Sequence, residues 1–194
     1  SRISLSNNDS GTSNTIFGKT AGDSDGAGDL NVFIGELAGG TGTQTDNADS
    51  NVGVGYRALT DLTSGANNSS VGKDSGTNLT SGSMNAILGV DALYTSTDVD
   101  KCIAIGKNAM YAGNATSDAD GTIAIGYDAG RAIISSVGSI AIGYEALNVE
   151  DDGDFSTAVG YQALKAQTGT SGAVGNSAVG YQSGKDITTG ISNT

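Results

Sequence analysis

The sequence predicts an all-β solenoid of about ten coils, each 17 or 20 residues long. One short phrase recurs ten times, and it is plainest at residues 139–147 and again at residues 156–164. Each phrase holds a polar residue, a short apolar strand and a glycine, and only the two spacings of 17 and 20 residues separate successive phrases. A unit this short cannot bury a hydrophobic face alone, so it must stack on its neighbours.

Composition points the same way. The chain has 31 glycines, no proline, no tryptophan and only 5% aromatic residues. Such a sequence has too little large apolar surface to build an ordinary globular core. Only a repetitive architecture, in which each coil covers the next, accounts for a folded chain of this composition.

The glycine of each phrase is predicted to turn a corner of the coil, with a positive φ at which a Cβ atom would clash. These corner glycines are Gly18, Gly35, Gly55, Gly72, Gly89, Gly106, Gly126, Gly143, Gly160 and Gly180.

The residues before each corner glycine alternate in character along the chain and are β-branched or small, which is typical of a short strand. Stacked coils then pair as parallel strands about 4.8 Å apart, giving a rod roughly 45 to 50 Å long. We expect a second short strand in the four residues after the glycine, followed by a polar return loop. The column directly before the glycine is always apolar and is predicted to be a core row: Phe17, Ile34, Val54, Val71, Leu88, Ile105, Ile125, Ile142, Val159 and Val179.

Two further columns hold small residues. Three positions after the glycine the residue is always Ala or Ser, and two positions before it the residue is mostly small, as at Gly53, Ser70, Ala104, Ala124, Ala141, Ala158 and Ala178. A thin coil has a poor ratio of surface to volume, so several chains are expected to bury a shared face. We predict that this contact between chains lies at the two small columns.

A polar column lies four positions before the glycine. It is Asn in the first five phrases and again at Asn176, and stacked Asn side chains can form a ladder in which each amide bonds the next. Cys102 occupies the same column and is the only cysteine, so no intrachain disulfide is possible. We interpret Cys102 as a small turn residue rather than a reactive thiol.

The chain divides into an entry strand and turn at residues 1–13 and a repeat shaft at residues 14–194. The phrase beginning at Asn193 stops short of its glycine, so we expect the shaft to continue in a longer parent protein. Three longer loops, at residues 40–50, 111–121 and 165–175, should project from one face. Their polar residues are the candidate surface contacts: Thr45, Asp46, Asn47, Asp49, Asn114, Asp118, Asp120, Thr168 and Thr170.

The sequence excludes much chemistry. With no histidine it has no catalytic triad and no His-based zinc site, and we predict no catalytic residue, metal or cofactor. The net charge of −12 disfavours nucleic acid and anionic membranes, and no apolar run is long enough for insertion into a membrane. Acidic clusters at residues 23–25, 118–120 and 150–154 are interpreted as solvated loop charge, with calcium binding left open.

Tyrosine follows the corner glycine in five coils: Tyr56, Tyr127, Tyr144, Tyr161 and Tyr181. A periodic aromatic of this kind indicates a packing ladder along the rod. The alternative is a surface that stacks against sugars.

The phrases at residues 122–126 and 139–143 resemble the head repeats of YadA-like trimeric autotransporter adhesins. The 17-residue form is still more similar to repeats of bacteriophage tail fibres. This resemblance implies a homotrimer of left-handed parallel β-rolls, acting as a non-catalytic structural and attachment segment of a virion tail fibre. The partners would be two identical chains and a host cell-surface glycan or protein.

Two alternatives to the tail fibre stay open. The first is the head domain of a bacterial adhesin, located on the cell surface. The second belongs to another class and is a polysaccharide-degrading tailspike.

Overall fold

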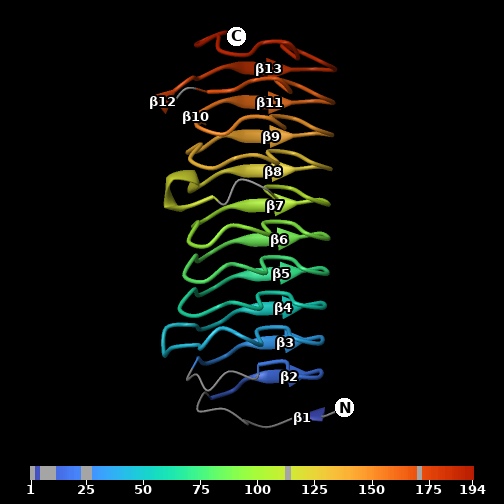
Figure 1. Cartoon of the computed structure of the whole chain (residues 1–194), viewed down its shortest axis with the longest axis vertical. Helices are drawn as coiled ribbons and strands as arrows, with labels where there is room; N and C mark the ends of the chain where they lie inside the picture. Colours follow the sequence, from blue (N-terminus) through green and yellow to red (C-terminus); the bar gives the residue numbers. More distant parts are fainter. Residues whose placement is uncertain (1–2, 5–11, 23–27, 112–114, 170–171) are drawn as a thin grey trace.

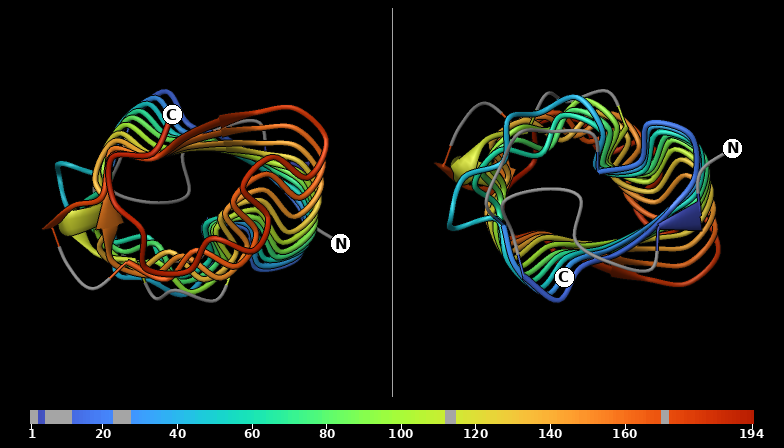
Figure 2. Two further views of the ribbon diagram at one scale, coloured as in Figure 1. Left: turned by 90° about the horizontal axis from the view of Figure 1, so that it is seen from above. Right: turned by 90° about the horizontal axis from the view of Figure 1, so that it is seen from below.

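The fold is a parallel β-solenoid, seen in a computed structural model that describes residues 3–4, 12–22, 28–111, 115–169 and 172–194. Figure 1 shows the coils stacked one above another, and Figure 2 shows them superposed around one axis. Ten parallel strands in the described residues form one face, confirming the predicted coil stack. They are β2 (Thr15–Phe17), β3 (Val32–Ile34), β4 (Val52–Val54), β5 (Ser69–Val71), β6 (Ala86–Leu88), β7 (Ile103–Ile105), β8 (Ile123–Ile125), β9 (Ile140–Ile142), β11 (Thr157–Val159) and β13 (Ser177–Val179).

The strands pair in the register that the phrases predict. Each residue lies beside the residue of the same column in the next coil, as Ile142 does beside Val159. At the N-terminal end β1 (Ile3–Ser4) adds to the same sheet in antiparallel orientation, within the segment expected as an entry strand. The remaining elements are β10 (Gly153–Asp154), its parallel partner β12 (Gly172–Ala173), and a 3₁₀ turn, η1 (Ser117–Ala119).

The corner glycines have positive φ, as predicted, with values from 127° to 145°. A Cβ atom on any of the first nine would lie 2.3 to 2.5 Å from the carbonyl oxygen of the corner glycine in the next coil. The column is therefore glycine for two reasons: the backbone conformation disfavours a side chain, and the coils stack too closely to admit one.

The second strand predicted after the glycine is wrong, because this stretch is a chain of turns. In the coil of Gly143, Glu145 has φ 52° and Leu147 has φ 46°, and Ala146 N–H bonds the Gly143 carbonyl. Glu145 N–H bonds Tyr127 of the coil before, while Leu147 N–H bonds Ala163 of the coil after. The alternating left-handed residues thus tie each turn to both neighbouring coils, which an extended strand at a corner cannot do.

Large side chains from two different columns fill the interior in different coils. Four positions after the corner glycine the residue is Leu or Met in five coils and Gly in the other five. Where it is Gly, a large side chain from another column takes the space: Phe33 lies against Gly39, and Ile133 lies against Gly130. A left-handed Leu costs roughly 1–2 kcal/mol in backbone energy, which the complete burial of side chains such as Leu147 offsets.

Candidate functional site

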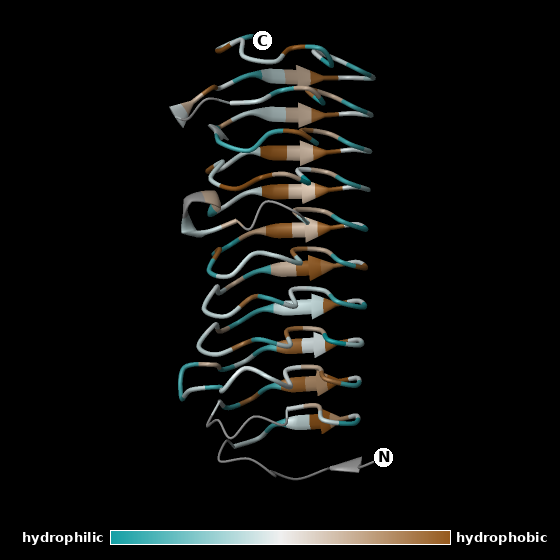
Figure 3. Cartoon of the chain, in the orientation of Figure 1, coloured by the Kyte–Doolittle hydropathy of each residue, from teal (hydrophilic) through white to brown (hydrophobic). Residues whose placement is uncertain are grey.

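The strands present an apolar face to the outside. We call the first and third residues of the ten parallel strands the outer strand face. The third residue of each of these strands is exposed or half-buried; Phe17, for example, is 49% exposed and Leu88 is 50% exposed. The middle residues, such as Ala141 and Ala158, are buried. Figure 3 shows much of this strand band coloured as hydrophobic. The predicted core row before the glycine is therefore wrong: it lies outside the coil.

The two small columns are inside the coil. Ala38, Ala58, Ala109 and Ala146 are fully buried within a single chain, and so are Ala104 and Ala124 two positions before the glycine. The prediction that chains meet at these columns is wrong, because no second chain can reach them. Small side chains are needed here since the strand and the turn after it approach each other across a narrow interior.

The asparagine column forms the predicted ladder. Nδ2 of Asn51, Asn68 and Asn85 donates to Oδ1 of the preceding Asn at 3.2, 3.1 and 3.0 Å. Each of these amides also donates to a loop carbonyl, and each Oδ1 accepts the backbone N–H of the next coil, as Asn68 does from Asn85 at 3.0 Å. The side chains are buried, so the ladder fixes the coil register from within.

Cys102 interrupts this ladder. Its thiol is buried and lies 3.4 Å from the Ala119 carbonyl oxygen, to which it donates. Burial raises the pKa of the Cys102 thiol from 9.0 to about 11. At neutral pH the group is protonated and shielded from solvent, which agrees with its interpretation as a turn residue.

The raised thiol pKa predicts a loss of stability in alkali. Between pH 9 and about 11 the unfolded chain ionises Cys102 while the folded chain keeps it protonated, so the free energy of unfolding should fall as pH rises. The expected loss is roughly 2–3 kcal/mol. Urea titrations across this range would measure it. Cys102→Ser should remove this part of the slope, and an unchanged slope in that variant would contradict the assignment.

The candidate loop residues lie in different surroundings. Thr45, Asp46 and Asn47 are exposed, and Thr168 is half-buried. Asp49 and Asp120 instead have structural roles, because their Oδ1 atoms accept the backbone N–H groups of Asp29 and Asp100 at 2.7 Å. Asn114, Thr170 and the side chain of Asp118 lie outside the described residues. In Figures 1 and 2 the longer loops lie at the same side of the solenoid.

The acidic cluster at residues 150–154 is occupied by hydrogen-bond donors. The buried Glu150 accepts the backbone N–H groups of Gly153 at 2.7 Å and Gly169 at 2.8 Å, and its other oxygen accepts the Gln167 amide. Asp152 and Asp154 accept bonds from Ser135 and Val137. The described part of the chain holds no group of three or more ligating side chains placed to bind a metal ion.

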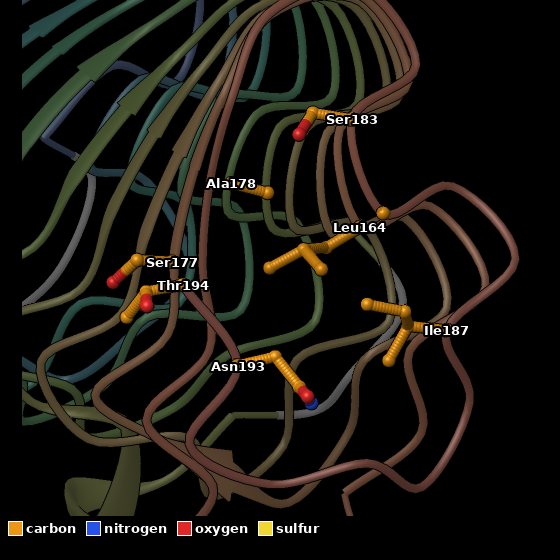
Figure 4. A pocket seen from close by; sticks show the side chains of 8 residues that line it. Leu164, Ser177, Ala178, Ser183, Ile187, Asn193 and Thr194 are labelled. Carbon is orange, nitrogen blue, oxygen red and sulfur yellow. The ribbon is translucent and has the colours of Figure 1, made fainter.

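A cavity of about 180 Å³ lies at the last coil (Figure 4). It is lined by Leu164, Ala178, Ile187 and Asn193 together with small polar residues. It is the end of the coil interior, and its lining residues include no acidic, basic or thiol group. The lining includes the hydroxyl groups of Ser177, Ser183 and Thr194, and no acidic or basic side chain of the lining stands beside them.

Comparison of the chain with family models, with characterised proteins and with solved structures found no match. Among the described residues no helix has the length and apolar character needed to cross a membrane.

Proposed function

We propose that this chain is a structural and attachment segment of a trimeric fibre of the phage tail type, without catalytic activity. The observation that supports the proposal best is the outer strand face. It places an apolar residue at the third strand position in all ten coils, and none of the first- or third-position side chains is fully buried by its own chain. An exposed apolar row that runs through all ten coils is typical of an interaction site.

The partner that fits this face is another copy of the same chain. The face repeats with the coil rise, so a parallel copy presents the same residues at the same intervals. Closed assemblies of identical chains are symmetric, and three solenoids around a common axis bury each outer strand face against the other two. The resemblance of the phrases to trimeric fibres and adhesins favours three chains over two.

Such a trimer would attach by many weak contacts. Three copies of each longer loop would project together, with the exposed Thr45, Asp46 and Asn47 among them. Repeated contacts with a host surface polymer give high avidity without high affinity at any one site. A passive role accords with a chain without histidine. Shortening of a polymer on incubation with the purified protein would contradict it.

Charge placed on the outer strand face should dissociate the trimer. We expect the native chain to sediment as an elongated particle of three chains, and Ile125→Asp combined with Ile142→Asp to give monomers, because the carboxylates would be buried between chains. Ile134→Asp is the matched control: Ile134 is 42% exposed but lies off this face, so this variant should remain trimeric. A monomeric or dimeric native chain would overturn the proposal, and circular dichroism would show whether each variant keeps its fold.

A further inference from the structure

Four tyrosines on consecutive coils form an exposed stack, here called the tyrosine ladder. Tyr127, Tyr144, Tyr161 and Tyr181 have ring centroids 5.2, 5.1 and 5.4 Å apart, with interplanar angles of 9° to 13°. The first three side chains are 41% to 43% exposed, and Tyr181 in the last coil is 74% exposed. Because neighbouring rings cover the ring faces between them, the exposed parts are mainly the ring edges and hydroxyl groups.

The ladder stands beside a second row of polar side chains. Gln182 Nε2 donates to Gln162 at 2.9 Å, and Gln162 Nε2 donates to Glu145 at 2.7 Å. Glu145 also pairs with Lys165, so its charge is locally compensated. The negative charge of Glu145 raises the pKa of Tyr144, which keeps the phenol protonated and able to donate. The result is a row of aromatic edges and hydroxyls on a fixed scaffold.

The spacing of this row selects a periodic ligand. Coils of a parallel solenoid repeat at about 4.8 Å, and the ring centroids of the tyrosine ladder lie 5.1 to 5.4 Å apart. In an extended β-linked glycan each pyranose advances the chain by a similar length, so successive sugars can meet successive coils. An α-1,4-linked glucose chain curves, so its successive sugars would leave this row. An anionic chain would be repelled by a protein of net charge −12.

We propose that the tyrosine ladder binds an extended, uncharged β-linked glycan that lies along the solenoid axis, one sugar to each coil. The inference rests on the attachment function proposed above and gives that function a ligand class. Each sugar meets the same hydroxyl and ring edge, so the contacts repeat along the polymer and add by multivalency. The same stripe on three chains increases the avidity further.

Soluble β-1,4-linked glucose oligosaccharides test the proposal by calorimetric titration of the full chain. Four coils carry the ladder, so we expect affinity to rise by about tenfold or more from two to four sugars and to change little from four to six. α-1,4-linked glucose oligosaccharides of the same lengths should bind weakly. Equal affinity for both linkages, or no dependence on length, would overturn the inference.

Variants separate the ladder from other tyrosines. Tyr144→Ala with Tyr161→Ala should weaken binding by about tenfold or more. The control is Tyr94→Ala with Tyr111→Ala, a stacked pair with centroids 5.4 Å apart in a different column, and it should bind as the native chain does. Equal losses in both double variants would contradict the ladder as the site.

Sedimentation of the same samples keeps this inference distinct from the proposed function. A trimer that binds none of the oligosaccharides overturns the glycan site alone. Loss of the trimer in the Tyr144 and Tyr161 variant would also overturn it, since the ladder would then belong to the interface between chains.

Discussion

Gly143→Ala should destabilise the solenoid by about 4 kcal/mol or more, a loss that few single substitutions reach. The new Cβ atom would lie 2.3 Å from the Gly160 carbonyl oxygen, where no side chain can rotate away. The backbone at Gly143 has φ 133°, which adds a conformational cost. Because both contact partners are backbone, the coils must separate locally.

Gly180→Ala is the matched control for this prediction. Gly180 has nearly the same φ, 127°, but a Cβ atom there meets nothing within 4 Å. It should therefore cost only the backbone component of about 1–3 kcal/mol. Urea unfolding followed by circular dichroism measures both variants, and hydrogen exchange should locate the Gly143 defect at the coils on either side. Equal losses in the two variants would show that stacking contact plays no part in the glycine requirement.

Features in which a residue packs on the equivalent residue of the next coil could be predicted from the sequence. The corner glycines, the in-register strands and the asparagine ladder all require that a residue meet its equivalent in the next coil. A fixed period of 17 or 20 residues carries that information directly. The period fixes neighbours along the axis regardless of the cross-section of the coil.

The cross-section itself could not be predicted in the same way. A three-residue strand such as Ile140–Ile142 places either its two isoleucines or its central Ala141 inside, and alternation allows both. Hydrophobicity alone favoured the isoleucines, but the interior is too narrow for them because a turn packs directly opposite. A signal for that turn was present: five glycines stand four positions after the corner glycine, where the backbone is left-handed.

The polar character of a loop residue does not establish that its side chain is free to contact a ligand. Asp49 and Asp120 are polar loop residues, yet each turns a carboxylate oxygen onto the backbone of the preceding coil. Asp29 and Asp100 stand at the same column, so recurrence of Asp there already indicated a structural ladder. The glycan site proposed for the tyrosine ladder depends instead on the distances between stacked rings, which only the coordinates give.

Asn68→Ala should cost about 3–5 kcal/mol because it breaks the asparagine ladder at its buried centre. The Asn68 amide donates to Asn51 Oδ1 and to the Gly82 carbonyl. Its Oδ1 accepts hydrogen bonds from the backbone N–H and from the side-chain amide of Asn85. Without this side chain, the Gly82 carbonyl and two N–H groups of Asn85 lose their hydrogen-bond partners in a site that solvent cannot reach. Asn68→Asp should be at least as damaging at neutral pH, because a carboxylate oxygen would replace the amide nitrogen and face the oxygen atoms of Asn51 and Gly82.

Asn193→Ala provides the comparison that isolates burial. Asn193 makes the same amide bond, to Asn176 Oδ1 at 2.9 Å, but it is exposed at the last coil. Water can replace the lost partner there, so the change in the free energy of unfolding should stay below about 1 kcal/mol. If Asn68→Ala proves as mild in urea unfolding as Asn193→Ala, the ladder does not hold the coils in register, and the stack must depend on the corner glycines and the alanine columns instead.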